Sequence, residues 1–467
     1  MFRILLLSTY ELGHQPFGLA SPAAVLERSG TRVDVIDLAV DRLDDEIVSR
    51  ADLIAFYVPM HTATRLAIML LPRVRALNPR AHLCFYGLYA ALNASHLRGL
   101  GVQSILSGEF EPGLTRLAQR LSRQDVAPAQ QEPLISLDRQ RFTMPQRAKL
   151  PSLDRYTRLI VAGERRVTGY TEASRGCKHA CRHCPVVPVY QGRFRIVDSD
   201  VVLRDVEWQV ERGARHITFG DPDFLNGPKH ADTVVRQFHR RFPDTTYDVT
   251  IKVEHLRRHP GMLPLLRDTG CLFITTAVES FDERVLTLLQ KNHTADDFRH
   301  VLDACRSVGI AMNPTFIAFT PWTSLDAYVQ FLEHIRRLDL IPNVAPVQYA
   351  VRLLIPSGSL LLELPEIRAL APVFNESALT HVWRHADPEV DRLQMRVFQS
   401  VQGAGPASGH RVNVFDGVWR LTAEAAGHST IAAAAVAADV VDEPSVPCLS
   451  EPWFCCSEPS DEQLAKV

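Results

Sequence analysis

The sequence has almost no net charge and no hydrophobic run long enough to cross a bilayer. Its 51 Lys and Arg residues nearly balance its 53 Asp and Glu residues, which leaves a formal net charge of −2. This balance argues against nucleic-acid and anionic-membrane partners. Residues 431–441 are apolar but too few to span a membrane. Residues 1–7 lack a signal-peptide cleavage site. We therefore expect a cytoplasmic protein.

The nine cysteines lack the even, spaced pattern of a secreted disulfide framework. Cys177, Cys181 and Cys184 lie within eight residues, and three more cysteines lie near the C-terminus. In an intracellular protein, clustered cysteines more often bind a metal or take part in catalysis. The clustered cysteines are therefore predicted to bind a metal or to act in catalysis, and not to form structural disulfides.

The first 123 residues alternate short apolar runs with helical patterns. Strands are expected near residues 2–8, 33–38, 53–58, 81–86 and 102–107. Strands that alternate with helices at this spacing predict an α/β fold, a Rossmann-like doubly wound parallel sheet. Ligands of such sheets bind at the carboxyl ends of the strands, here residues 9–18, 59–61, 87 and 108–109.

A second β/α series follows and predicts a partial (β/α)6 barrel. Its six strands are expected near residues 167–172, 216–220, 247–252, 273–278, 313–318 and 347–354. The expected divisions are an N-terminal domain (1–123), a linker (124–165), the barrel (166–365) and a C-terminal extension (366–467).

The three clustered cysteines follow the first predicted barrel strand. A structural zinc site and a closed iron–sulfur cluster both take four protein ligands. Three thiolates leave one iron of a cluster open to a small molecule. The alternative is a zinc site that recruits His179 or His183 as the fourth ligand.

The Cys-x3-Cys-x2-Cys spacing resembles the radical S-adenosylmethionine (SAM) superfamily, whose members cleave SAM reductively at a [4Fe-4S] cluster. Residues 278–280 and 288–294 look like the "ESG…L…K.HT" stretch of cobalamin-domain members. Phe319-Thr320-Pro321 departs from the family's Gly-x-Pro. The resemblance implies metal ligation by Cys177, Cys181 and Cys184. It implies SAM contacts for residues near the strand ends: Gly220, Asp221, Asp223, Lys252, Glu254, Glu279, Ser280 and Arg352.

Simpler structural roles remain open for several of these residues. Asp221 and Asp223 could cap a helix. Lys252 and Glu254, two residues apart, would share one face of a strand. Glu279 could lie on a solvated face or form a barrel ion pair. Arg352, within an apolar strand, needs a carboxylate partner from SAM, substrate or a nearby Glu.

The N-terminal domain resembles the cobalamin-binding domain that precedes many radical SAM barrels. Residues 108–111 match its "GExE" turn, but the Asp-x-His-x-x-Gly signature for lower-axial ligation is absent. Two interpretations stay open: cobalamin bound without a His ligand, or an empty domain that acts as a scaffold.

The C-terminal tail resembles the radical SAM group named for its Cys-Cys-Ala-Glu-Pro ending, with Ser457 in place of the Ala. Soft thiolates select thiophilic centres. The resemblance implies that Cys448, Cys455 and Cys456 act in catalysis. They would present arsenite or a selenium species to a 3-amino-3-carboxypropyl group from SAM, with flavodoxin or ferredoxin as the electron donor.

Three alternatives for the tail and the chain remain. The tail could hold a second iron–sulfur or zinc site, or act as a reducing dithiol. The chain could be a cobalamin-dependent methyltransferase or another natural-product-tailoring radical SAM enzyme. A non-catalytic metal-binding or redox-sensing module is the third.

Overall fold

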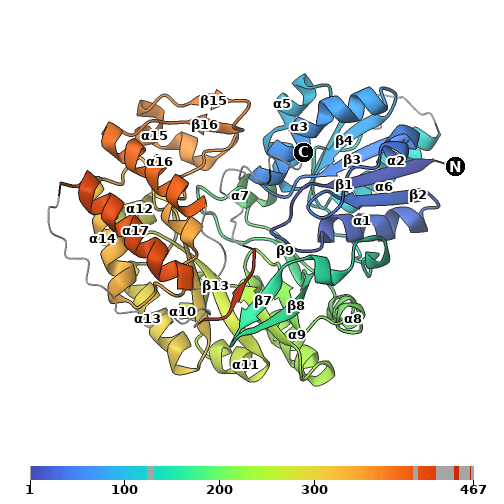
Figure 1. The fold of residues 1–467 in the computed structure, drawn as a ribbon. Coiled ribbons are helices and arrows are strands. Elements are labelled where there is room, and N and C mark those ends of the chain that lie inside the picture. Colours follow the sequence, from blue (N-terminus) through green and yellow to red (C-terminus); the bar gives the residue numbers. More distant parts are fainter. Residues whose placement is uncertain (1, 124–130, 403–408, 428–445, 452–462, 464–467) are drawn as a thin grey trace.

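The computed structural model describes residues 2–123, 131–402, 409–427, 446–451 and 463. Two sheet-containing domains lie side by side (Figure 1). The blue N-terminal domain flanks the green and yellow barrel, and the orange and red C-terminal helices lie on the barrel's other side. Within the described ranges, no helix combines the length and apolar character needed to cross a bilayer.

The N-terminal domain alternates strands and helices, as predicted. Its strands are β1 (Arg3–Ser8), β2 (Arg32–Asp37), β3 (Leu53–Tyr57), β4 (His82–Tyr86), β5 (Ser104–Gly108) and β6 (Ile135–Ser136). Its helices are α1 (Phe17–Arg28), α2 (Asp45–Arg50), α3 (His61–Leu77), α4 (Leu88–Leu92), α5 (Ala94–Gly99) and α6 (Phe110–Ser122).

The strand order of this domain is β2-β1-β3-β4-β5-β6, with parallel pairing throughout. Leu19 of α1 and Leu117 of α6 pack on one face of the sheet, and Leu70 of α3 packs on the other. The order reverses between β1 and β3, which is where such sheets bind ligands. The loop after β1 faces the barrel, because the Thr157 amide donates to the Gly13 carbonyl at 2.8 Å.

The second domain is built on a seven-stranded sheet. Its strands are β7 (Arg158–Val161), β8 (Glu164–Thr171), β11 (His216–Phe219), β12 (Thr246–Thr250), β13 (Cys271–Glu279), β14 (Ala311–Phe316) and β17 (Cys448–Leu449). A separate two-stranded antiparallel sheet is formed by β9 (Ser174–Gly176) and β10 (Phe194–Ile196). The helices of this region are α7 (Val186–Tyr190), α8 (Ser199–Val210), α9 (Pro228–Arg241), α10 (Val253–Arg258), α11 (Met262–Asp268), α12 (Glu283–Leu288), α13 (Ala295–Ser307) and α14 (Leu325–Arg337).

The C-terminal extension adds helices and a small hairpin. These are α15 (Pro365–Ala369), β15 (Val373–Asn375), β16 (Thr380–Val382), α16 (Pro388–Gln402) and α17 (Gly409–Ala425).

Single 3-10 turns occur earlier in the chain. They are η2 (Arg147–Lys149), η3 (Leu153–Arg155), η4 (Phe224–Asn226), η5 (Pro346–Tyr349) and η6 (Leu360–Glu363).

The large sheet curls into a nearly closed barrel. Its order is β14-β13-β12-β11-β8-β7-β17, and the five strands from β8 to β14 run parallel. β7 runs antiparallel to β8, and β17 runs antiparallel to β7. The Asn313 side-chain amide of β14 donates to the Pro447 carbonyl at 3.3 Å, so the segment leading into β17 reaches the opposite edge.

The inner face of the barrel is polar. Along β11, Ile217 and Phe219 belong to the hydrophobic core, and Phe219 packs edge-on against Phe238 of α9. On the opposite face, His216 and Thr218 both contact the Asp248 carboxylate of β12, at 2.9 and 2.7 Å. This alternation follows from the two-residue period of a strand, and it gives the barrel interior hydrogen-bonding groups.

The structure corrects one predicted strand. Residues 347–354 do not form a sixth barrel strand: they begin in η5, and a single bridge joins Phe319 to Arg352. An apolar run also suits a buried turn, so hydrophobicity alone could not separate the two. The segment expected as a linker contributes β6 to the first sheet and β7 to the second.

Candidate active site

The predicted metal ligands lie on the loop that follows β8 and β9. Cys177 and Cys184 pack against an apolar cluster that includes Val186 and Tyr190, and Cys181 is buried. All three thiols are free. Burial raises the pKa of Cys177 to about 11 and that of Cys184 to about 12, so a bound metal must displace thiol protons.

The two histidines of this loop are bound to carboxylates on other elements. His179 Nε2 lies 3.1 Å from Asp223 Oδ2, and His183 Nε2 lies 3.1 Å from Glu279 Oε1. Neither contact favours the zinc alternative, in which one histidine joins the thiols as a fourth ligand. The donor set that remains for a metal at the three cysteines themselves is therefore three thiols, which fits an iron–sulfur cluster with one open iron.

Gly220 and Asp221 follow β11 and brace the strand that leads into the cysteine loop. A Cβ atom at Gly220 would lie 1.9 Å from the Tyr170 hydroxyl, so only glycine fits. Asp221 accepts hydrogen bonds from the Ala173 amide at 2.9 Å and the Ser174 hydroxyl at 2.5 Å. Burial raises the pKa of Asp221 to about 7. Asp221 therefore caps no helix.

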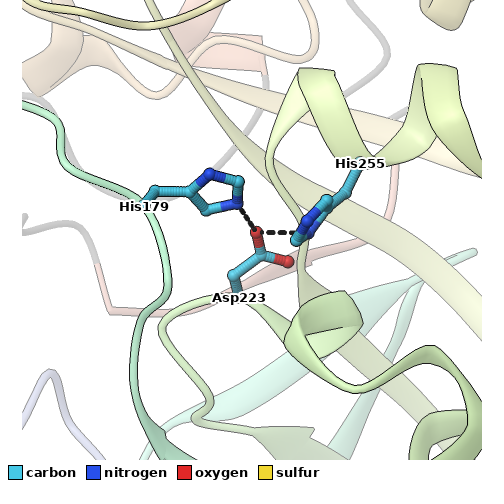
Figure 2. A group of neighbouring side chains, drawn as sticks. All are labelled: His179, Asp223 and His255. Carbon is cyan, nitrogen blue, oxygen red and sulfur yellow. Dashed lines mark hydrogen bonds and ion pairs between the residues drawn. The ribbon is translucent and has the colours of Figure 1, made fainter. Parts of the chain in front are cut away.

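Asp223 caps η4 through the Leu225 amide at 3.1 Å and meets two histidines with its other oxygen (Figure 2). Asp223 Oδ2 lies 3.1 Å from His179 Nε2 and 2.8 Å from His255 Nδ1. Burial opposes ionisation, but these two contacts prevail and lower the pKa of Asp223. His255 has no recognisable motif in the sequence, so its part in this group was missed.

Lys252 and Glu254 do not share a strand face, because β12 ends at Thr250. Lys252 is the N-cap of α10, and Glu254 lies in its first turn. The two still meet, since Lys252 Nζ lies 2.9 Å from Glu254 Oε2. Lys252 Nζ also lies 3.4 Å from His179 Nδ1, so the pair borders the cysteine loop.

Glu279 ends β13 and forms a barrel ion pair, one of the structural alternatives to its predicted SAM contact. Its Oε1 atom lies 3.2 Å from Lys291 Nζ and 3.1 Å from His183 Nε2. Burial alone would raise the pKa of Glu279, but Lys291 and His183 outweigh it and hold the pKa at about 2. Glu279 has a left-handed φ of 70°, which is uncommon outside glycine. Backbone strain of this kind is concentrated at functional sites, where the position of a side chain must be fixed.

Ser280 and Arg352 have structural partners. The Ser280 hydroxyl accepts from the Asp282 amide at 3.0 Å. Arg352 donates to Asp391 at 2.7 Å and lies over the Trp383 ring, 3.5 Å from its centroid. Asp391 supplies the carboxylate that the sequence required for Arg352.

A cavity of about 200 Å³ lies between the N-terminal domain and the barrel mouth; Glu11, His14, Tyr57, Tyr170 and Arg175 are among its lining residues. The "GExE" turn borders it and binds the barrel, since Glu111 Oε1 lies 2.7 Å from Arg175 Nη1. Within the barrel, Glu172 Oε2 lies 2.7 Å from Arg175 Nε. Arg175 immediately precedes Gly176 and the cysteine loop, so the turn helps to position that loop.

The described part of the tail follows the barrel edge towards the N-terminal domain. Cys448 is buried, and it pairs with Ile160 of β7. Three residues later, Glu451 accepts a hydrogen bond from the Tyr10 hydroxyl at 3.0 Å. Cys455 and Cys456 lie outside the described residues.

Comparisons with known proteins give distant relatives. The hopanoid C-3 methylase of Methylococcus capsulatus is 24% identical over 327 residues, which are 66% of this chain and 62% of that protein. A tRNA-2-methylthio-N(6)-dimethylallyladenosine synthase of Pasteurella multocida is 23% identical over 200 residues, 40% of this chain and 42% of that protein. The chain therefore spans less than two thirds of either relative.

Solved structures share the fold at low identity. The radical SAM methyltransferase TsrM of Kitasatospora setae, bound to tryptophan and a SAM analogue, gives a TM-score of 0.61 at 17% identity, covering 80% of this chain and 77% of that one. The cobalamin-dependent radical SAM enzyme OxsB with aqua-cobalamin gives 0.66 at 13% identity, covering 85% and 66%. Residues 171–332, which contain the cysteine loop, match the Radical SAM superfamily model. The chain is therefore an enzyme whose residues 171–332 match the radical SAM superfamily.

Proposed function

We propose that Cys177, Cys181 and Cys184 hold a [4Fe-4S] cluster and that SAM binds beside it at the carboxyl ends of the barrel strands. The observation that carries this proposal is a loop with three free thiols whose two histidines are already bound to carboxylates. When bound, such a cluster supplies the electron that breaks a carbon–sulfur bond of SAM.

The finer proposal concerns the tail. We propose that the chain belongs to the Cys-Cys-Ala-Glu-Pro group and moves the 3-amino-3-carboxypropyl group of SAM to a thiophilic centre, such as arsenite or a selenium species, held by Cys455 and Cys456. Support comes from Glu451, whose partner Tyr10 belongs to the apolar cluster that Cys177 and Cys184 contact. Four further residues, which reach Cys455, span up to about 14 Å when extended.

Cys448 has a weaker claim to a catalytic role. It pairs with β7 near the start of β8, at the end of the barrel opposite the cysteine loop. Burial raises the pKa of its thiol, which disfavours a free thiolate. Its proposed role rests on the resemblance of the tail.

The proposed transfer to arsenite balances with two electrons and one proton. The bond between sulfur and the aminocarboxypropyl carbon breaks, and a carbon–arsenic bond forms. Methylthioadenosine leaves, and one arsenic-bound hydroxyl leaves as water. A flavodoxin or ferredoxin would supply both electrons.

The test is anaerobic reconstitution followed by mass analysis of SAM fragments with and without arsenite. Methylthioadenosine together with an aminocarboxypropyl arsenical supports the finer proposal, whereas 5′-deoxyadenosine contradicts it. Replacing Cys177, Cys181 and Cys184 with Ala should abolish the iron-dependent absorbance and all SAM cleavage. The double change Cys455→Ser and Cys456→Ser should abolish the arsenical and leave SAM cleavage intact, while Cys305→Ala, buried on α13, should change neither.

A cobalamin-dependent methyl transfer is the second candidate, favoured by the similar folds of TsrM and OxsB. The fit at the switch point of the first sheet is poor, because the cavity there is about 200 Å³ and pockets for drug-sized ligands are about 300–1,000 Å³. A corrin would require the lining side chains to move. Corrin absorbance after purification with hydroxocobalamin, together with methylcobalamin-dependent turnover, would favour this candidate.

A further inference from the structure

Three buried side chains of types that can bind a metal meet beside the cysteine loop, with no thiol among them (Figure 2). His179 comes from the loop itself, Asp223 follows β11, and His255 lies in α10. One ligand atom from each residue lies within 4.8 Å of the other two. The side chains are 8%, 2% and 0% exposed, respectively.

Hydrogen bonds do not explain why the polar ring of His255 is fully buried. Its Nδ1 atom lies 2.8 Å from Asp223 Oδ2 as an ion pair without hydrogen-bond geometry, and its Nε2 atom has no hydrogen-bond partner among the described residues. A buried polar group without a partner is costly, and such groups in folded proteins call for an explanation such as a bound ion. Both nitrogens are therefore available as ligand atoms.

We propose that His179, Asp223 and His255 form a second metal site, separate from the three cysteines, for one divalent first-row transition metal such as Fe(II) or Zn(II). With metal–ligand bonds of about 2.1 Å, adjacent ligand atoms lie about 3–3.4 Å apart. The contacts of 2.8 and 3.1 Å to Asp223 Oδ2 are close to this spacing. Two imidazoles and one carboxylate leave coordination positions open for water or substrate.

The surrounding charges are compatible with a cation at this place. Lys252 Nζ lies 3.4 Å from His179 Nδ1, but Glu254 holds it at 2.9 Å. Glu254 also pairs with Arg258 at 2.7 Å. Because His179 lies between Cys177 and Cys181, a metal here would tie the cysteine loop to the end of β11 and to α10. This site goes beyond the proposed function and does not depend on the chemistry of the tail.

The test removes the competing thiols first. A parent variant carries Cys177→Ala, Cys181→Ala, Cys184→Ala, Cys455→Ser and Cys456→Ser. It is equilibrated anaerobically with Co(II) or Zn(II) and analysed for metal content. We expect one equivalent of bound metal, and at least a tenfold weaker affinity after adding either His255→Ala or Asp223→Asn. The matched control His216→Asn alters another buried His–Asp pair, whose atoms lie 2.9 Å apart, and should still bind one equivalent of metal.

X-ray absorption of the Zn(II)-loaded parent tests the ligands directly, without relying on the folding of further variants. Nitrogen and oxygen ligands that include imidazole are expected. A parent that binds no metal, or one whose zinc has sulfur ligands, would overturn the proposal. The wild-type chain gives a separate result: an iron–sulfur spectrum with SAM cleavage tests the proposed function and is unaffected by either outcome.

Discussion

At the scale of single residues, the barrel mouth buries its charges in pairs. Glu279 meets Lys291, and Lys252 meets Glu254. All four side chains are less than a tenth exposed. A buried pair contributes little net stability, but the loss of one partner leaves a buried charge without compensation.

Lys291→Met should therefore lower the free energy of unfolding by about 3 kcal/mol. Glu279 would then keep only His183 as a partner. The double variant Lys291→Met with Glu279→Leu should lose less stability than Lys291→Met alone, because no buried charge is left without a partner. Urea denaturation of the two single variants and the double variant measures the coupling. Additive effects would contradict the importance of this pair.

Asp37, at the end of β2, should make stability depend on pH. It accepts hydrogen bonds from the Tyr156 hydroxyl at 2.9 Å and the Ala39 amide at 3.1 Å, but burial still raises the pKa of Asp37 to about 7. Between pH 4 and 7 the unfolded chain releases a proton that the folded chain retains. The contribution of Asp37 to stability is thus complete at low pH and declines as the pH rises through this window, by up to about 1.4 kcal/mol per pH unit.

Replacing Asp37 with Asn should remove that decline. Urea denaturation between pH 4.5 and 8 should show the wild type losing stability relative to Asp37→Asn until about pH 7, with a constant difference above it. Asp52→Asn, at an exposed position, serves as the control for the loss of a carboxyl group. Parallel pH profiles for the wild type and Asp37→Asn would refute the assignment.

At the scale of elements, a strand of only two residues covers one edge of the barrel sheet. β17 has only two residues, yet it covers the free edge of β7, and Pro447 just before it accepts a hydrogen bond from Asn313 of β14. Uncovered strand edges offer unpaired backbone groups to other chains. The tail thus has a structural role before any chemical one.

Removing residues 447–467 should lower the melting temperature by several degrees and promote aggregation, because the edge of β7 is then exposed. A chain that ends at Glu451 keeps β17 and should melt close to the wild type. Differential scanning calorimetry together with light scattering compares the two truncations. If both melt alike, β17 does not stabilise the barrel.

Local patterns predicted much of this architecture. Alternating apolar runs located both parallel sheets, and cysteine spacing located the loop that carries the three neighbouring thiols. They did not predict β17, since two residues carry no periodic signal and their partners lie almost 300 positions away. The partners of the loop histidines were missed for the same reason: Asp223, Glu279 and His255 meet the loop only once the barrel curls.

At the scale of the whole molecule, Arg147 joins the two domains. Its guanidinium, 1% exposed, makes a bidentate pair with Asp205 of α8, donates to Gln15 of the N-terminal domain at 2.8 Å, and donates to the Tyr170 carbonyl of β8 at 2.5 Å. One side chain thus connects the loop after β1 with the first parallel strand of the barrel.

Arg147→Met should lower the free energy of unfolding by about 3–5 kcal/mol, because Asp205 is left buried without its cation. Loss of this link should also split the single calorimetric transition expected of the wild type into two. Lys149→Met is the control: its pair with Glu27 is about one-third exposed and should contribute at most about 1 kcal/mol. A single, unshifted transition in Arg147→Met would count against coupled domains.

Arg175 limits how this enzyme can be recombined with its relatives. A chimera that kept the barrel but received a foreign N-terminal half would enclose Arg175 without Glu111. Functional hybrids should therefore require the acidic turn and the arginine to be inherited together, although 64 positions of sequence separate Glu111 from Arg175. The two halves of the chain are thus expected to diversify as one unit rather than as exchangeable modules.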